Sequence, residues 1–170
     1  RGAARLIEVA LQHVVPHHAQ DPQKHAVEAR LLAAFMVRYQ DSVCEASTVY
    51  PGVAEFVATA RAAGIRLACV TNKPYRPAVA LLEALNLLDA FELVIGGDSL
   101  LHKKPHPEPL LHCLRHFEVT AAQALMIGDS RNDVDAAKAA GVKSLALPYG
   151  YNHGEPIEAC EPDRLVASLA

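Results

Sequence analysis

The most constraining feature of this chain is the alternation of short apolar runs with helical stripes after residue 50. The predicted strands cover residues 65–70, 93–95, 125–127 and 144–147. Helices with an apolar stripe are predicted over residues 53–63, 77–86, 107–117 and 131–140. Strands that alternate with helices form parallel βαβ units, and the helices then cover both faces of the sheet. The sequence therefore predicts an α/β fold built around a parallel sheet.

The first 48 residues differ from the rest because they contain helical patterns and no strand pattern. Helices are expected over residues 3–14 and 25–39, with prolines in the segment between them. We therefore divide the chain into a small helical cap lobe over residues 1–48 and an α/β core over residues 49–170. A short final helix is expected near residues 163–168.

Composition excludes several classes of function. The net charge is -3, with acidic and basic residues interspersed, so no basic stripe indicates a nucleic-acid partner. No apolar stretch approaches the roughly 20 residues that a membrane span needs, and we recognise no signal peptide. The cysteines form no CxxC pair, which is typical of a reducing cytoplasm, and Cys69 is expected to be a buried thiol. The sequence does not indicate an oligomeric state.

Two aspartates follow the predicted strand over residues 125–127. Asp129 comes directly after Gly128, and Asp133 lies four residues later, where a helix is expected to begin. Two carboxylates in one crevice repel each other unless a proton or cation intervenes. A hard cation that also binds phosphate and water, Mg²⁺, is the simplest ligand for them. Alternatively, Ser130 and Asp133 match a capping box, which would give Asp133 a purely structural role.

Two further loops carry residues suited to anions. Thr71 and Asn72 follow a predicted strand, where a hydroxyl, an amide and backbone N–H groups can hold an anion. Lys104 precedes Pro105, which restricts its backbone, and its ammonium is a point charge for phosphate. The alternative interpretations are a turn at Thr71 and Asn72 and a solvated basic loop around Lys104.

The histidines show no spacing typical of a metal site with cysteines or acids. His112 and His116 lie four residues apart on one predicted helix, but no third ligand accompanies them. A partly exposed helix face explains this pair more simply, so no zinc site is expected.

Taken together, these segments resemble the haloacid dehalogenase-like hydrolases, and within them the phosphoglycolate phosphatases. The resemblance rests on Val70-Thr71-Asn72-Lys73, Lys103-Lys104-Pro105-His106-Pro107, Met126-Ile127-Gly128-Asp129-Ser130 and the tail from Tyr149 to Ile157. It implies a Rossmann-like sheet with a helical cap. It also implies that Thr71 and Lys104 are catalytic, that Thr71, Asn72 and Lys104 bind phosphate, and that Asp129 and Asp133 hold Mg²⁺.

The resemblance also implies an Asp-x-Asp motif on the first, central strand of the sheet, and no such motif precedes the core here. We therefore expect the sheet to lack this strand. We also expect the intact gene product to carry roughly 40–50 further residues in front, in keeping with normal domain sizes. The absent aspartate would be the nucleophile that forms an aspartyl-phosphate.

The expected function is Mg²⁺-dependent hydrolysis of a small phosphorylated acid, 2-phosphoglycolate, with a phosphate ester as the only partner. The alternatives within the same superfamily are another phosphatase, a pyrophosphatase, a phosphonate hydrolase or a sugar-phosphate mutase. A further alternative is an inactive relative that binds phosphate or a partner protein.

Overall fold

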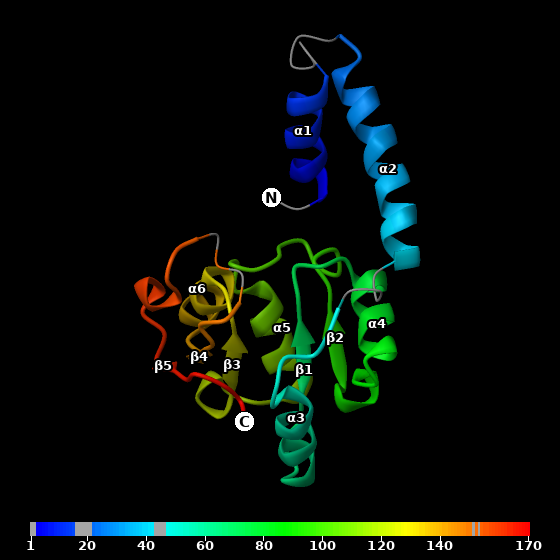
Figure 1. Ribbon diagram of the computed structural model, residues 1–170. Helices are drawn as coiled ribbons and strands as arrows, with labels where there is room; N and C mark the ends of the chain where they lie inside the picture. Colours follow the sequence, from blue (N-terminus) through cyan, green and yellow to red (C-terminus); the bar gives the residue numbers. More distant parts are fainter. Residues whose placement is uncertain (1–2, 16–21, 43–46, 151, 153) are drawn as a thin grey trace. The chain divides into compact units, whose positions relative to one another are not determined.

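The computed structural model of the protein describes residues 3–15, 22–42, 47–150, 152 and 154–170. The chain divides into two compact units, Arg1–Glu45 and Ala46–Ala170 (Figure 1). Within the described ranges, every helix falls short of the length and apolar character that a membrane span requires.

The first unit consists of helix α1 (Ala3–Val14) and helix α2 (Lys24–Ser42), which pack side by side (Figure 1). Helix α1 has the predicted bounds, and α2 is longer than predicted at both ends. The assignment of this unit as a cap stays a prediction.

The second unit has the predicted alternation of helices with parallel strands. Strand β1 (Ala68–Val70) pairs with β2 (Leu93–Ile95). Strand β4 lies between β3 and β5, and their bounds are Leu125–Gly128 for β3, Lys143–Ala146 for β4 and Arg164–Leu165 for β5. The helices are α3 (Val53–Ala62), α4 (Tyr75–Ala84), α5 (Glu108–Phe117) and α6 (Arg131–Ala140). Every strand pair is parallel, which confirms the predicted α/β class.

Helix α6 lies at the centre of the core because it contributes to two apolar clusters. Ala136 and Ala137 are fully buried against Leu110 of α5 and Val142. Val134 packs with Ala146, Ile157 and Cys160 in the second cluster. The small alanine side chains let α6 lie close to β3 and β4. Helix α5 contacts both β1 and α6 and so connects the two groups of strands.

Among the described residues, the strands form two separate sheets, β1–β2 and β3–β4–β5. Strands β1 and β3 do not pair with each other, and they are the strands between which the sequence predicts a central strand. All three residues of β1 are only half-buried, and Leu125 of β3 is exposed. Cys69 is therefore less buried than predicted, since β1 has a paired strand on one side only.

The prediction of a final helix near residues 163–168 is wrong. This segment contains strand β5, and a short 3-10 helix covers Ile157–Cys160 instead. Asp163 fixes the strand in place, because its carboxylate accepts hydrogen bonds from the Ser144 backbone N–H at 2.9 Å and the Ser144 hydroxyl at 3.0 Å. The Val166 N–H then continues the ladder to the Ala146 carbonyl at 3.1 Å. Tertiary pairing has overridden a weak local helix preference.

We predict that Asp163→Asn destabilises the protein more at neutral pH than at low pH. The Lys143 ammonium, 2.6 Å away, and the Ser144 N–H lower the pKa of Asp163 from 3.8 to about 2. Because the folded-state pKa is depressed, the carboxylate stabilises the fold above the unfolded-state value and loses this effect as the pH falls towards 2. Urea unfolding of the variant and wild type at several pH values measures the difference.

The control for this experiment is Glu161→Gln, since the Glu161 carboxylate is highly exposed and lies 3.6 Å from Lys138. A surface pair of this kind contributes little to stability. A stability difference for Asp163→Asn that stays constant across the acid range would contradict the prediction.

Candidate active site

The predicted site residues come from three connections that follow parallel strands. Thr71 and Asn72 follow β1, Lys104 lies between β2 and α5, and Asp129 follows β3 directly. In open α/β sheets, ligands bind at the carboxyl ends of the strands. These connections therefore lie where such a site is expected.

Lys104 and Asp133 form a buried ion pair, with Lys104 Nζ 2.6 Å from Asp133 Oδ1. Lys104 Nζ also donates a hydrogen bond to the Val70 carbonyl at the end of β1. Asp133 belongs to the first turn of α6, which follows β3. Lys104 therefore connects the carboxyl end of β1 to α6, the helix that follows β3. The alternative of a solvated basic loop does not describe Lys104, which is buried, while its predicted contact with phosphate stays a prediction.

Asp133 also caps α6, which is the structural role considered from the sequence, while its role as a metal ligand stays a prediction. Its Oδ2 accepts hydrogen bonds from the backbone N–H groups of Asp129 and Ser130, both at 3.1 Å. The Ser130 hydroxyl accepts from the Asn132 N–H at 3.1 Å, which completes the capping box. Both Asp133 oxygens are thus already bound to donors. This arrangement suits Asp133 to hold the loop of Asp129 and leaves Asp129 as the more available metal ligand.

Asp129 is half-buried and lies beside Asp133 without being part of the ion pair. Burial, followed by the negative charge of Asp133, raises the pKa of Asp129, and the Lys104 ammonium offsets only part of this effect. A desolvated carboxylate next to a second carboxylate is stabilised by a bound cation. The donor set is all oxygen, which fits a hard ion such as Mg²⁺.

Thr71 and Asn72 both make local contacts that position the loops. The Thr71 hydroxyl accepts a hydrogen bond from the Lys73 N–H at 3.1 Å, and its own proton can be donated elsewhere. Asn72 donates from Nδ2 to the Lys104 carbonyl at 2.8 Å, while its buried Oδ1 has no partner among the described residues. Asn72 therefore holds the loop that carries Lys104, and its predicted phosphate contact stays a prediction.

Gly128 and Gly150 provide space for the two aspartates. A methyl group on Gly128 would overlap the Asp133 side chain, and one on Gly150 would overlap the Asp129 carboxylate. Neither glycine has a positive φ, so the need is for space and not for an unusual backbone conformation. The sequence alone does not reveal this role, because it depends on which side chain lies next to each glycine in space.

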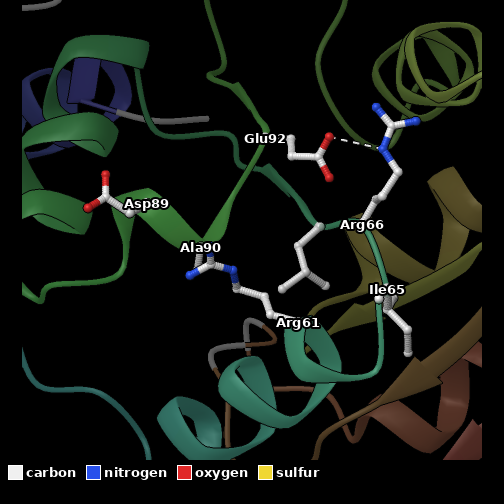
Figure 2. A pocket seen from close by; sticks show the side chains of 8 residues that line it. Arg61, Ile65, Arg66, Asp89, Ala90 and Glu92 are labelled. Carbon is white, nitrogen blue, oxygen red and sulfur yellow. Dashed lines mark hydrogen bonds and ion pairs between the residues drawn. The ribbon is translucent and has the colours of Figure 1, made fainter.

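A cavity of about 190 Å³ lies at the opposite ends of β1 and β2 (Figure 2). It is lined by residues that precede these strands, such as Arg66 and Glu92. These two side chains pair with each other at 2.9 Å, and the Arg66 guanidinium also lies 4.4 Å from the centre of the Phe117 ring. The cavity is therefore remote from the carboxyl ends of the strands, and Arg66, one of the two arginines that line it, is already paired, so we do not assign the site to it.

The loop around Lys104 also brings together His102, His106 and Glu108, whose potential ligand atoms lie within 4.8 Å of one another. The spacing of the histidines in the sequence did not indicate this trio. The loop between β2 and α5 folds back on itself, and spacing in the sequence does not reveal this approach. His112 and His116 of α5 are not part of the group.

Comparison with known proteins identifies the family of this chain. The family model of haloacid dehalogenase-like hydrolases matches residues 3–147. The phosphoglycolate phosphatase of Nitrosococcus oceani is 43% identical over 168 residues, which cover 99% of this chain and 73% of that protein. The phosphoglycolate phosphatase of Escherichia coli (strain K12) is 44% identical over 143 residues, which cover 84% of this chain and 57% of that protein.

A crystal structure of a predicted phosphoglycolate phosphatase from Haemophilus somnus 129PT has a TM-score of 0.85 and 32% sequence identity. The match covers 99% of this chain and 72% of that chain. The chain thus spans 57% to 73% of the length of these three relatives. The family match includes Thr71, Lys104, Asp129 and Asp133. The chain belongs to the haloacid dehalogenase-like hydrolases.

Proposed function

We propose that the protein hydrolyses a small phosphorylated acid, 2-phosphoglycolate, with Mg²⁺ as cofactor. The observation that carries this proposal is the buried Lys104–Asp133 pair beside the half-buried carboxylate of Asp129, which forms no ion pair among the described residues. Relatives named phosphoglycolate phosphatase at 43% and 44% identity support the choice of substrate. Activity tests use the full-length gene product, because the chain spans only part of these relatives.

In this proposal, Asp129 is the protein ligand of the metal, and Asp133 orients Asp129 and Lys104. A bound Mg²⁺ would neutralise charge on the phosphoryl oxygens. Phosphoryl transfer depends mostly on such positioning and charge neutralisation. Lys104 adds a fixed positive charge, and the Thr71 hydroxyl donates its proton to a phosphoryl oxygen. Asn72 holds the Lys104 loop with one amide hydrogen and donates the other to the phosphate.

We further propose that the helical unit Arg1–Glu45 acts as a cap that closes over the acid end of the substrate. Closure of such a unit excludes water from the reacting phosphate and completes the substrate contacts.

We predict that Lys104→Met lowers kcat on 2-phosphoglycolate by at least about a hundredfold, since it removes a fixed charge on the phosphoryl group. The same change leaves the Asp133 carboxylate buried without its partner, so the free energy of unfolding falls by about 3–5 kcal/mol. Turnover and urea unfolding are measured together, with activity assayed at a temperature where circular dichroism shows the variant folded.

The matched control is Lys103→Ala, because Lys103 is the adjacent and exposed lysine. We expect it to retain near wild-type turnover. Full turnover by folded Lys104→Met would remove Lys104 from the mechanism, and hydrolysis of other phosphate esters in preference to 2-phosphoglycolate would overturn the substrate proposal.

We predict that Asp129→Asn weakens binding of Mg²⁺, or of Mn²⁺ as its paramagnetic substitute, by at least about tenfold. The amide removes the negative charge that a hard cation requires, while the capping contacts of Asp133 are unaffected because they involve the backbone of Asp129. Calorimetry with Mg²⁺ and electron paramagnetic resonance with Mn²⁺ give the affinity directly and without an assay of turnover.

Asp135→Asn is the control, since Asp135 lies on the same helix two residues beyond Asp133. Like Asp129→Asn, this change removes one negative charge, but it leaves the proposed ligand Asp129 in place. Equal loss of affinity in both variants would show that net charge, and not ligation by Asp129, controls metal binding.

A further inference from the structure

A second group of potential metal ligands lies on the loop that leads into α5. His102, His106 and Glu108 each offer one ligand atom, and these atoms lie within 4.8 Å of one another. The two imidazole rings are stacked with their centres 4.1 Å apart. The trio shares no residue with the Asp129 and Asp133 pair, so it is a distinct donor set.

The arrangement is held by hydrogen bonds that fix the position of the carboxylate. Glu108 Oε2 accepts from the His102 backbone N–H at 2.8 Å and lies 3.0 Å from His102 Nδ1. The Glu108 N–H in turn donates to His106 Nδ1 at 3.2 Å. These contacts engage one nitrogen of each ring.

The spacing and exposure of the three side chains suit a bound ion. Ligand atoms around a tetrahedral Zn²⁺ with bonds of about 2.0–2.1 Å lie roughly 3.3 Å apart, so a small side-chain rotation closes this set. The His102 and Glu108 side chains are 48% and 30% exposed, which gives an ion access from solvent. The Lys104 ammonium is turned away into its buried pair with Asp133 and does not oppose a cation here.

The donor types decide which ion fits. Two imidazoles and one carboxylate favour Zn²⁺ and other divalent first-row transition metals over Mg²⁺, which prefers oxygen ligands. We propose that His102, His106 and Glu108 bind one such transition-metal ion, with water completing its coordination. His102 and His106 flank Lys104 symmetrically, so a bound ion would also tie down both sides of the loop that carries this lysine.

The competing explanation is that the trio only stabilises the loop through the His102–Glu108 pair and ring stacking. The two explanations differ in one respect, since a loop clamp binds no metal at these residues. Calorimetric titration with Zn²⁺, in excess Mg²⁺ to occupy the hard-ion site, separates them. We expect wild type to bind one equivalent of Zn²⁺ that the His102→Ala/His106→Ala double variant does not bind.

The matched control is the His112→Ala/His116→Ala double variant, which removes two histidines from α5 and leaves the trio intact. We expect it to bind Zn²⁺ as wild type does. A second readout is the visible absorption of Co²⁺ with nitrogen ligands, which the His102→Ala/His106→Ala variant should lose. His102, His106 and His116 are exposed and His112 is half-buried, so circular dichroism is used to check that each variant is folded.

The proposal fails if wild type binds no Zn²⁺ in excess Mg²⁺. It also fails if the two double variants bind the same number of equivalents with the same affinity, because the ligands would then lie elsewhere. Neither result depends on whether the protein hydrolyses 2-phosphoglycolate.

Discussion

The buried contact between Lys104 and Asp133 organises the site. It joins three parts of the chain, since the lysine comes from the loop before α5, the aspartate from the start of α6, and the Val70 carbonyl from the end of β1. A buried ion pair gains little net stability, because the two charges must first lose water. It does, however, impose one arrangement, since either charge without the other would be costly. The contacts of Lys104 therefore fix the end of β1 relative to the start of α6, although β1 and β3 belong to separate sheets.

Asp133 in the first turn of α6 and Asp129 between β3 and α6 illustrate how the environment gives identical side chains different roles. Asp133 is surrounded by donors from Lys104, Asp129 and Ser130. Burial, and after it repulsion from the negative charge of Asp133, raises the pKa of Asp129. Asp133 is therefore satisfied by donors from the protein, and our proposal assigns the cation to Asp129. Gly128 and Gly150 allow this arrangement because no side chain fills the space beside either carboxylate.

The loop of Lys104 lies next to two sets of potential metal ligands with different chemistry. Carboxylate oxygens follow β3, and His102 and His106 flank the lysine in the sequence. Hard and borderline cations prefer different donors. Our proposals assign the hard-ion set to phosphate ester chemistry and the imidazole set to a transition metal.

The sequence by itself determined the elements whose signals are local. Helix α6 begins at a capping box around Ser130 and ends at Gly141, with φ of 70°, and both ends are recognisable from residue type alone. Thr71 and Asp129 follow directly on β1 and β3, and the sequence places both at the carboxyl ends of parallel strands, where ligands bind. Lys104 lies further along the connection between β2 and α5, and the proline after it is its local signal. What the sequence left open was whether Asp133 caps a helix or serves the site, and the structure shows that capping and the contact with Lys104 occur together.

Only the tertiary structure decided contacts between residues that are distant or separated by an irregular loop. Residues 164–165 became a strand because β4 offered backbone partners and Ser144 held Asp163, which no local pattern encodes. Asn72 was committed to the Lys104 carbonyl, and His102, His106 and Glu108 met through a reversal of the loop. Local propensity is a sum over neighbouring residues, whereas these contacts depend on where the backbone returns in space.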